Sequence, residues 1–164
     1  MQLLTFNVDC NRYAIKTCSI REVLPVVKLM SLPFSIPGVT GLLNYSGIAV
    51  PVIDLTTLIS GKPTKPLMSS RIVIINHQLA DNNKRLLALL LEQATEIIRH
   101  DEMMVQDYGI SMKETDFLGE LIYDTQGVIQ LVDPVNLLSA TTHNSIFKTL
   151  DNSDCTAKSS SALK

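Results

Sequence analysis

The chain has 164 residues, of which 46% are hydrophobic and 18% are charged, so it can bury the core of one ordinary domain. Its formal net charge of -2 argues against nucleic acid as a partner, and its apolar runs are too short for direct membrane insertion. No signal peptide is expected, because no charged segment followed by a long apolar stretch opens the sequence. The odd number of cysteines (Cys10, Cys18 and Cys155) without zinc-site spacing favours reduced thiols in a cytoplasmic protein.

Short strands separated by polar turns dominate the first part of the chain. Residues 3–8 and 12–15 lie on either side of the turn Asp9-Cys10-Asn11, and alternate residues of the first run are apolar, which predicts an antiparallel hairpin. Residues 17–30 are expected to be extended or mixed, because Pro25 disfavours a continuous helix. These segments already indicate a β-rich fold.

A second hairpin is predicted around the turn Tyr45-Ser46-Gly47, between VTGLLN (39–44) and IAVPVIDL (48–55). Pro51 cannot donate a ladder hydrogen bond, so it indicates an edge position or a bulge in the second strand. A short helical turn is expected at 55–59. The core of this hairpin, from residue 41 to residue 55, has one aspartate and one tyrosine as its only ionisable side chains, so it holds no catalytic constellation.

Residues 60–70 form a loop by composition, and the strand pattern resumes after them. RIVIIN (71–76) and KRLLALLLE (84–92) predict a third hairpin, which ATEIIRH (94–100) continues. The six consecutive apolar residues of LLALLL point to both faces of one strand. Either that strand lies between two layers, or one of its faces is offered to a partner.

The last strands are predicted at 117–124 and 127–133, followed by a short helix in PVNLLSA (134–140) with proline in its first turn. Residues 101–115 support no assignment, and the polar C-terminal tail, 141–164, is expected to be flexible. Roughly nine short strands without a long helix predict an all-β chain. The loop between the second and third hairpins is expected to divide it into two strand groups, each the size of a small barrel.

No group of residues forms a recognisable catalytic, metal or cofactor site. His77, His100 and His143 are far apart and have no cysteine or histidine at ligand spacing, so each is interpreted as solvated or hydrogen-bonded. The sequence has neither a glycine-rich phosphate loop nor a Gly-x-Ser-x-Gly nucleophile motif. It therefore predicts a protein without enzymatic activity, while several apolar segments suit binding to another protein.

The order of these pieces resembles the chemotaxis coupling proteins, the CheW-like domain family. The resemblance rests on four stretches: IREVLP (20–25), GLLNYSGIAVPVIDL (41–55), KRLLALLLEQATEII (84–98) and GVIQLVDPVNLL (127–138). It covers about residues 2–140, so a single domain of two barrel subdomains is expected at 1–140, ahead of the tail.

The resemblance implies two intertwined five-stranded SH3-like barrels with short helical turns. It also implies a scaffold without enzymatic activity or cofactor that couples a chemoreceptor (a methyl-accepting chemotaxis protein) to a CheA-type histidine kinase in a bacterial signalling array. The receptor's cytoplasmic tip hairpin would dock in the cleft between the barrels, and the kinase regulatory domain would join through apolar strand edges. Such a protein is cytoplasmic and is recruited to membrane receptor arrays.

The resemblance assigns a partner-binding surface to the second hairpin and the strand before it. Gly41 and Gly47 would shape the turn, Asn44 would tie it, and Val50-Pro51-Val52 would offer an edge on which proline discourages indiscriminate pairing. The expected partner-binding residues are Ile20, Glu22, Val23, Gly41, Asn44, Tyr45, Ser46, Gly47 and Val50.

One departure from the family pattern lies at the turn, where the usual Asn-Leu-Arg-Gly is Asn-Tyr-Ser-Gly in residues 44–47. The family arginine commonly faces an acid that corresponds to Glu22, so Glu22 is expected to lack its partner unless Arg21 or a cation of another protein serves. The chain is interpreted as a divergent coupling protein. It would either serve a non-flagellar system, such as twitching or surface sensing, or bind only the kinase or only the receptor. Neutral drift at a tolerant position is the alternative explanation for the changed turn. Replacing Tyr45 by alanine is expected to weaken partner binding and leave thermal stability nearly intact.

Overall fold

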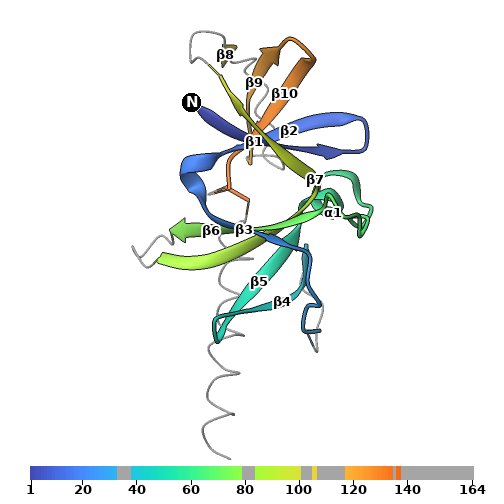
Figure 1. Cartoon of the computed structure of the whole chain (residues 1–164), viewed down its shortest axis with the longest axis vertical. Coiled ribbons are helices and arrows are strands. Elements are labelled where there is room, and N and C mark those ends of the chain that lie inside the picture. Colours follow the sequence, from blue (N-terminus) through green and yellow to red (C-terminus); the bar gives the residue numbers. More distant parts are fainter. Residues whose placement is uncertain (33–37, 79–83, 101–104, 107–116, 135, 138–164) are drawn as a thin grey trace, which may run out of the picture.

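The computed structural model describes residues 1–32, 38–78, 84–100, 105–106, 117–134 and 136–137. Its elements in chain order (Figure 1) are β1 (Gln2–Val8), β2 (Asn11–Lys16), a 3-10 helix η1 (Thr17–Ser19), β3 (Ile20–Pro25), β4 (Val39–Tyr45), β5 (Ile48–Asp54), α1 (Leu55–Ser60), β6 (Arg71–Gln78), β7 (Lys84–Arg99), β8 (Val105–Gln106), β9 (Leu118–Asp124) and β10 (Gly127–Val132). The all-β prediction is confirmed.

The short helix α1 has the capping groups that its sequence suggests. The side chain of Asp54 accepts a hydrogen bond from the backbone N–H of Thr57 at 3.2 Å, which satisfies a donor at the helix start. Gly61, with φ of 75°, ends the helix in the left-handed region. The helix expected at 134–140 lies largely outside the described residues, and the part that is described, 134 and 136–137, forms a turn and bends.

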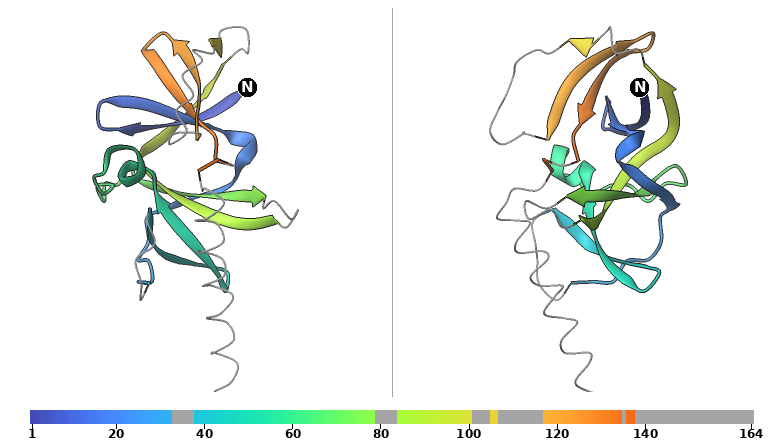
Figure 2. Two further views of the ribbon diagram at one scale, coloured as in Figure 1. Left: turned by 180° about the vertical axis from the view of Figure 1, so that it is seen from behind. Right: turned by 90° about the vertical axis from the view of Figure 1, so that its left-hand side faces the viewer.

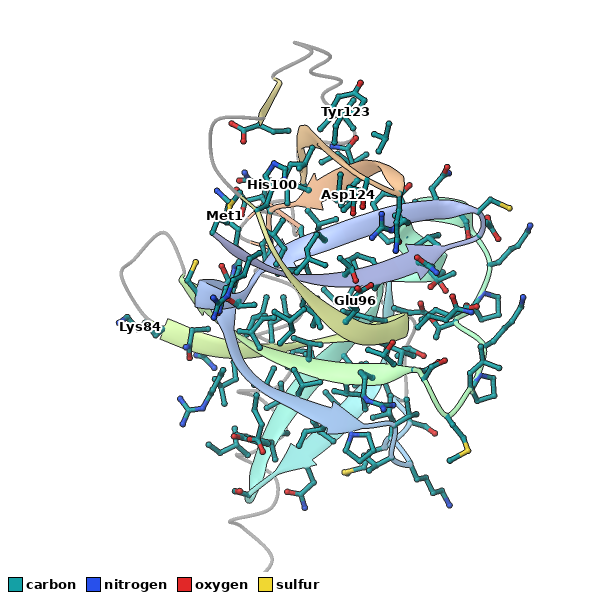
Figure 3. All side chains as sticks on the ribbon, turned by 45° about the horizontal axis from the view of Figure 1, so that its top comes forward. Met1, Lys84, Glu96, His100, Tyr123 and Asp124 are labelled. Carbon is teal, nitrogen blue, oxygen red and sulfur yellow. The ribbon has the colours of Figure 1, made fainter. Side chains whose placement is uncertain are left out.

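Strand β7 belongs to both halves of the molecule. Its first half, from Lys84 to Leu91, pairs antiparallel with β6 and parallel with β5. Its second half pairs antiparallel with β1, between Glu92 and Arg99. Lys84 and Glu96 mark the two halves in Figure 3, where the strand turns from one sheet into the other. The residue at the change of direction, Gln93, has φ of 53°.

The two halves of β7 each complete a five-stranded barrel. Barrel 1 consists of β1, β2, β10, β9 and the second half of β7, with the two-residue β8 added at β9. Barrel 2 consists of β3, β6, the first half of β7, β5 and β4. The β9–β10 hairpin and the β4–β5 hairpin therefore lie at opposite ends of the molecule (Figures 1 and 2).

The expectation that the 60–70 loop separates the two strand groups is wrong. Barrel 2 is one continuous stretch, Ile20–Leu91, and the loop joins α1 to β6 inside it. Barrel 1 combines strands from both ends of the described chain. Turn residues mark where strands end, but they do not indicate which strands pair across long sequence distances.

The buried side chains form three clusters, and the largest lies between the barrels. It combines residues of β1 and β2 with residues of β5, β6 and β7. A second cluster fills barrel 2, and a third, smaller one fills barrel 1. On β7, Leu87, Leu89 and Leu91 belong to the cluster between the barrels, whereas Ala88 belongs to the core of barrel 2. The LLALLL run is thus packed on both faces, fully buried toward the cluster between the barrels and half-buried at Leu86 and Leu90 toward barrel 2, so the strand lies between two layers.

Candidate functional site

The candidate site lies at the free edge of β3 and the turn of the β4–β5 hairpin, both in barrel 2. Strand β3 pairs only with β6 among the strands that the structure describes, so its other edge is unpaired. The register shifts between Ile20 and Glu22, which inserts Arg21 as an extra residue.

That bulge decides which way the side chains of β3 face. Residues opposite each other in a ladder share a face. Val23 lies opposite Val73 of the cluster between the barrels, whereas Glu22 lies opposite Ile74 of the barrel 2 core. Val23 is 42% exposed and Glu22 is exposed, so the predicted residues Glu22 and Val23 are accessible, while Ile20 is half-buried against the cluster between the barrels.

The hairpin turn is a two-residue loop of the kind that suits twisted strands. Tyr45 and Ile48 form the last pair of the ladder, and both residues between them have positive φ, 51° at Ser46 and 84° at Gly47. Two successive positive φ values are typical of a type I′ turn. The backbone N–H of Gly47 donates to Oδ1 of Asn44 at 2.9 Å. The geometry matches the proposed turn-forming roles of Gly47 and Asn44.

Tyr45 connects the hairpin to the edge strand. Its ring packs against the barrel 2 core, and its hydroxyl donates a hydrogen bond of 2.5 Å to Oε2 of Glu22. Glu22 thus has a partner within the chain, but this partner is a neutral hydroxyl and not the cation that the family pattern led us to expect. The replacement of the family leucine by tyrosine supplies a neutral hydroxyl to the carboxylate that the family arginine commonly faces.

Two of the expected partner-binding residues are inside the protein. Val50 is 0% exposed in the barrel 2 core, so it supports the hairpin and cannot touch a partner. Gly41 is buried within β4 rather than at the turn, and a Cβ there would lie 2.9 Å from the carbonyl oxygen of Met30 and 3.0 Å from Cβ of Leu29. Gly41 thus permits the chain that follows β3 to pass against β4.

The expected free edge at Val50-Pro51-Val52 is also wrong, since all three side chains are buried and Val52 pairs with Ala88 of β7. Pro51 fits because Leu42, the residue opposite, exchanges its backbone hydrogen bonds with Met30 at 2.8 and 2.9 Å. The Leu42–Pro51 pair is consequently a position without ladder hydrogen bonds between β4 and β5, so the missing N–H of proline removes no hydrogen bond to β4.

Ile48 is a site residue that the sequence reasoning missed. It lies opposite Tyr45 and on the same face as Val50 and Val52, yet it is 55% exposed because the strand extends past the core of barrel 2. The period-2 alternation from Val52 back through Val50 to Ile48 could have indicated it.

The histidines and acidic residues that the sequence offers as candidate ligands lie outside this site. No set of three or more His, Cys, Asp and Glu residues there could hold a metal ion. His77 and His100 are buried rather than solvated. The backbone N–H of His100 donates to the carbonyl of Met1 at 2.9 Å, and Figure 3 labels Met1 and His100. His143 lies outside the described residues. Of the helices described, none has the length and apolarity needed to cross a membrane.

Comparisons with known proteins agree with this geometry. A protein of Rhizobium etli named "Probable chemotaxis protein CheW" is 25% identical over 105 residues, which are 64% of this chain and 64% of that protein. The crystal structure of the scaffolding protein TtCheW from Thermoanaerobacter tengcongensis matches with a TM-score of 0.73 at 20% identity, over 86% of this chain and 89% of that one, which shows a common fold. The CheW-like domain model matches residues 2–142. The chain belongs to the CheW-like domain family.

Proposed function

We propose that the chain is a non-enzymatic adaptor that couples a chemoreceptor to a CheA-type histidine kinase in a bacterial chemosensory complex. The observation that carries this proposal is the family match over residues 2–142. The name of the Rhizobium etli relative, a probable chemotaxis protein, supports the same process. In this role the chain acts in the cytoplasm and is recruited to receptor arrays.

The shape of the molecule suits such a role, because an adaptor must hold two partners in a fixed geometry. The two barrels share β7 and a single continuous cluster of buried side chains. Movement of one barrel against the other would break that cluster, so the partners would be held by one rigid unit. The receptor's cytoplasmic tip hairpin and the kinase regulatory domain are the two partners in this proposal.

We assign the partner contact in barrel 2 to the exposed part of the candidate site. Glu22, Val23 and the turn residues Ser46 and Gly47 are exposed, and Tyr45 is half-buried beside them. Gly41 and Val50 are excluded because they are buried.

A calorimetric titration against each of two probes from the same genome tests the proposal. One probe is the receptor-tip hairpin, and the other is the kinase regulatory domain. Binding to both is expected. Binding to only one would identify the divergent adaptor that serves kinase or receptor alone, as in a twitching or surface-sensing system. Binding to neither would overturn the proposed function.

A further inference from the structure

Three side chains form a patch at the open end of barrel 2, which we name the rim patch: Glu22, Tyr45 and Ile48. Tyr45 and Ile48 are cross-strand neighbours on the core-facing side of the hairpin, and Glu22 lies on the core-facing side of β3. The exposure of Ile48 carries the apolar face of barrel 2 out to solvent, and Tyr45 neighbours both Ile48 in the ladder and the carboxylate of Glu22.

Among the residues that the structure describes, the negative charge of Glu22 is oriented by a hydrogen bond but has no ion-pair partner. The hydroxyl of Tyr45 is a neutral donor that holds Oε2 of the carboxylate. In the part of the chain that the structure describes, the ion pairs are Arg12–Asp124 and Lys62–Asp9, and neither includes Glu22. Arg21, the nearest cation in sequence, occupies the bulge and makes no ion pair among these.

We propose that the protein partner that docks at the rim patch presents a lysine or arginine to Glu22 and an apolar side chain to Ile48. This inference rests on the proposed function and specifies the chemistry of the partner. A partner that covers Glu22 removes water from its carboxylate, and an uncompensated charge in an interface opposes binding. The Tyr45 hydroxyl keeps the carboxylate in one orientation, which favours a directional pair with a cation.

The charge of this rim also gives specificity. A chain with arginine at position 46 could neutralise the acid internally and would offer a partner no net charge there. This chain has Ser46 and offers an anion beside an apolar side chain. A partner with an acid at the matching position would be repelled.

The test uses the full chain, the receptor-tip hairpin and the kinase regulatory domain in titrations at low and high salt. Glu22→Gln keeps an acceptor for Tyr45 but removes the charge. It is expected to lower the affinity for the docked partner about tenfold and to make that affinity depend less on salt. Ser46→Arg is expected to lower the affinity for the same partner, because a cation within the chain then competes with the partner's cation for Glu22. Ile48→Ser should weaken binding at both salt concentrations equally, since its contact is apolar.

Glu96→Gln is the matched control, because Glu96 is an exposed glutamate on the barrel 1 half of β7. It should change neither affinity nor its salt dependence. Thermal unfolding of each variant separates a lost contact from a lost fold. If Glu22→Gln folds and binds both probes like the unaltered chain, the inference is overturned while the adaptor function stands. If the unaltered chain binds neither probe, the proposed function fails and this inference fails with it.

Discussion

Arg12 on β2 and Asp124 at the end of β9 are 112 residues apart in sequence, and Nη1 of the arginine donates to both carboxylate oxygens at 2.9 and 2.8 Å. The pair connects the β9–β10 hairpin to β2, where β10 is joined by a parallel ladder of only three residue pairs. Asp124 is labelled in Figure 3. This contact therefore helps to close barrel 1.

We expect the Arg12–Asp124 contact to make stability depend on acid pH. Burial raises the pKa of the Asp124 carboxyl. The opposite effect is larger: it comes from hydrogen bonds donated by the Arg12 side chain and by the Gln126 and Gly127 backbone, together with the charge of Arg12. The pKa of Asp124 therefore lies below its usual value. A lowered pKa in the folded state contributes stability at neutral pH that is lost as pH falls through that pKa. Asp124→Asn should lower the free energy of unfolding by about 1 kcal/mol at neutral pH.

Urea unfolding at a series of pH values measures this contribution. The difference between the unaltered chain and Asp124→Asn should shrink as pH falls below about 4 and vanish once the carboxyl is protonated. A difference that stays constant down to the lowest pH would mean that packing, and not the charge of Asp124, carries the effect.

Gly41→Ala should destabilise barrel 2. The new Cβ would meet backbone, the carbonyl oxygen of Met30 at 2.9 Å, so the chain that follows β3 must shift. The expected loss of unfolding free energy is about 1–3 kcal/mol. Gly119→Ala is the control, since its Cβ would meet nothing nearer than 3.6 Å and its φ is not positive. Equal stability of the two variants in denaturant unfolding would contradict the close approach at Gly41.

Ser46→Asn should stabilise the hairpin turn. Serine at φ of 51° is in the left-handed region, which asparagine tolerates better, and Asn-Gly is the preferred pair in a type I′ turn. A gain of about 0.5 kcal/mol is expected, visible as a higher melting temperature. The variant with alanine at the same position is the comparison, and it should gain nothing.

Leu89→Ala should cost about 2–5 kcal/mol of unfolding free energy, because it opens a cavity in the cluster between the barrels. The neighbouring Leu90→Ala is the matched variant, since Leu90 is half-buried on the barrel 2 face and should cost less. Because β7 serves both barrels, hydrogen exchange should show faster opening of β1 as well as β6 in Leu89→Ala. Faster exchange confined to one barrel would contradict a shared core.

The Tyr45→Ala prediction needs a second variant. Because the ring of Tyr45 packs against the barrel 2 core, alanine should also cost stability, by about 1–2 kcal/mol for a half-buried ring. Tyr45→Phe keeps the ring and removes only the hydrogen bond to Glu22. Thermal unfolding should find Tyr45→Phe close to the unaltered chain and Tyr45→Ala below it. Equal melting temperatures for all three would show that the ring contributes no packing.

The strands and turns could be predicted from the sequence because their signals are local. Apolar alternation and polar turns located both hairpins of barrel 2 and both of barrel 1. The path of β7 could not be predicted, since its change of direction at Gln93 carries no glycine or proline. Pairing across the molecule decides that change, as β1 and β6 take opposite halves of the strand.

The candidate site also combines features that the sequence predicts locally with contacts that it does not predict. The turn at Ser46 and Gly47, and the tie from Asn44, follow from residue types within four positions. The hydrogen bond from Tyr45 to Glu22 spans 23 residues and depends on the bulge at Arg21, which no local pattern indicates. The burial of Val50 is in principle visible in the sequence, because Val50 shares its face of the strand with the buried Val52.

The order of strands has a consequence for synthesis on the ribosome. Barrel 2 is encoded by one continuous stretch that ends at Leu91, so it can form as soon as that residue has emerged. The β1–β2 hairpin is made before barrel 2 but cannot pair with β9 and β10 until residue 132 has been translated. In a nascent chain β2 therefore waits for β10 while barrel 2 forms, so barrel 1 closes only after barrel 2 is complete.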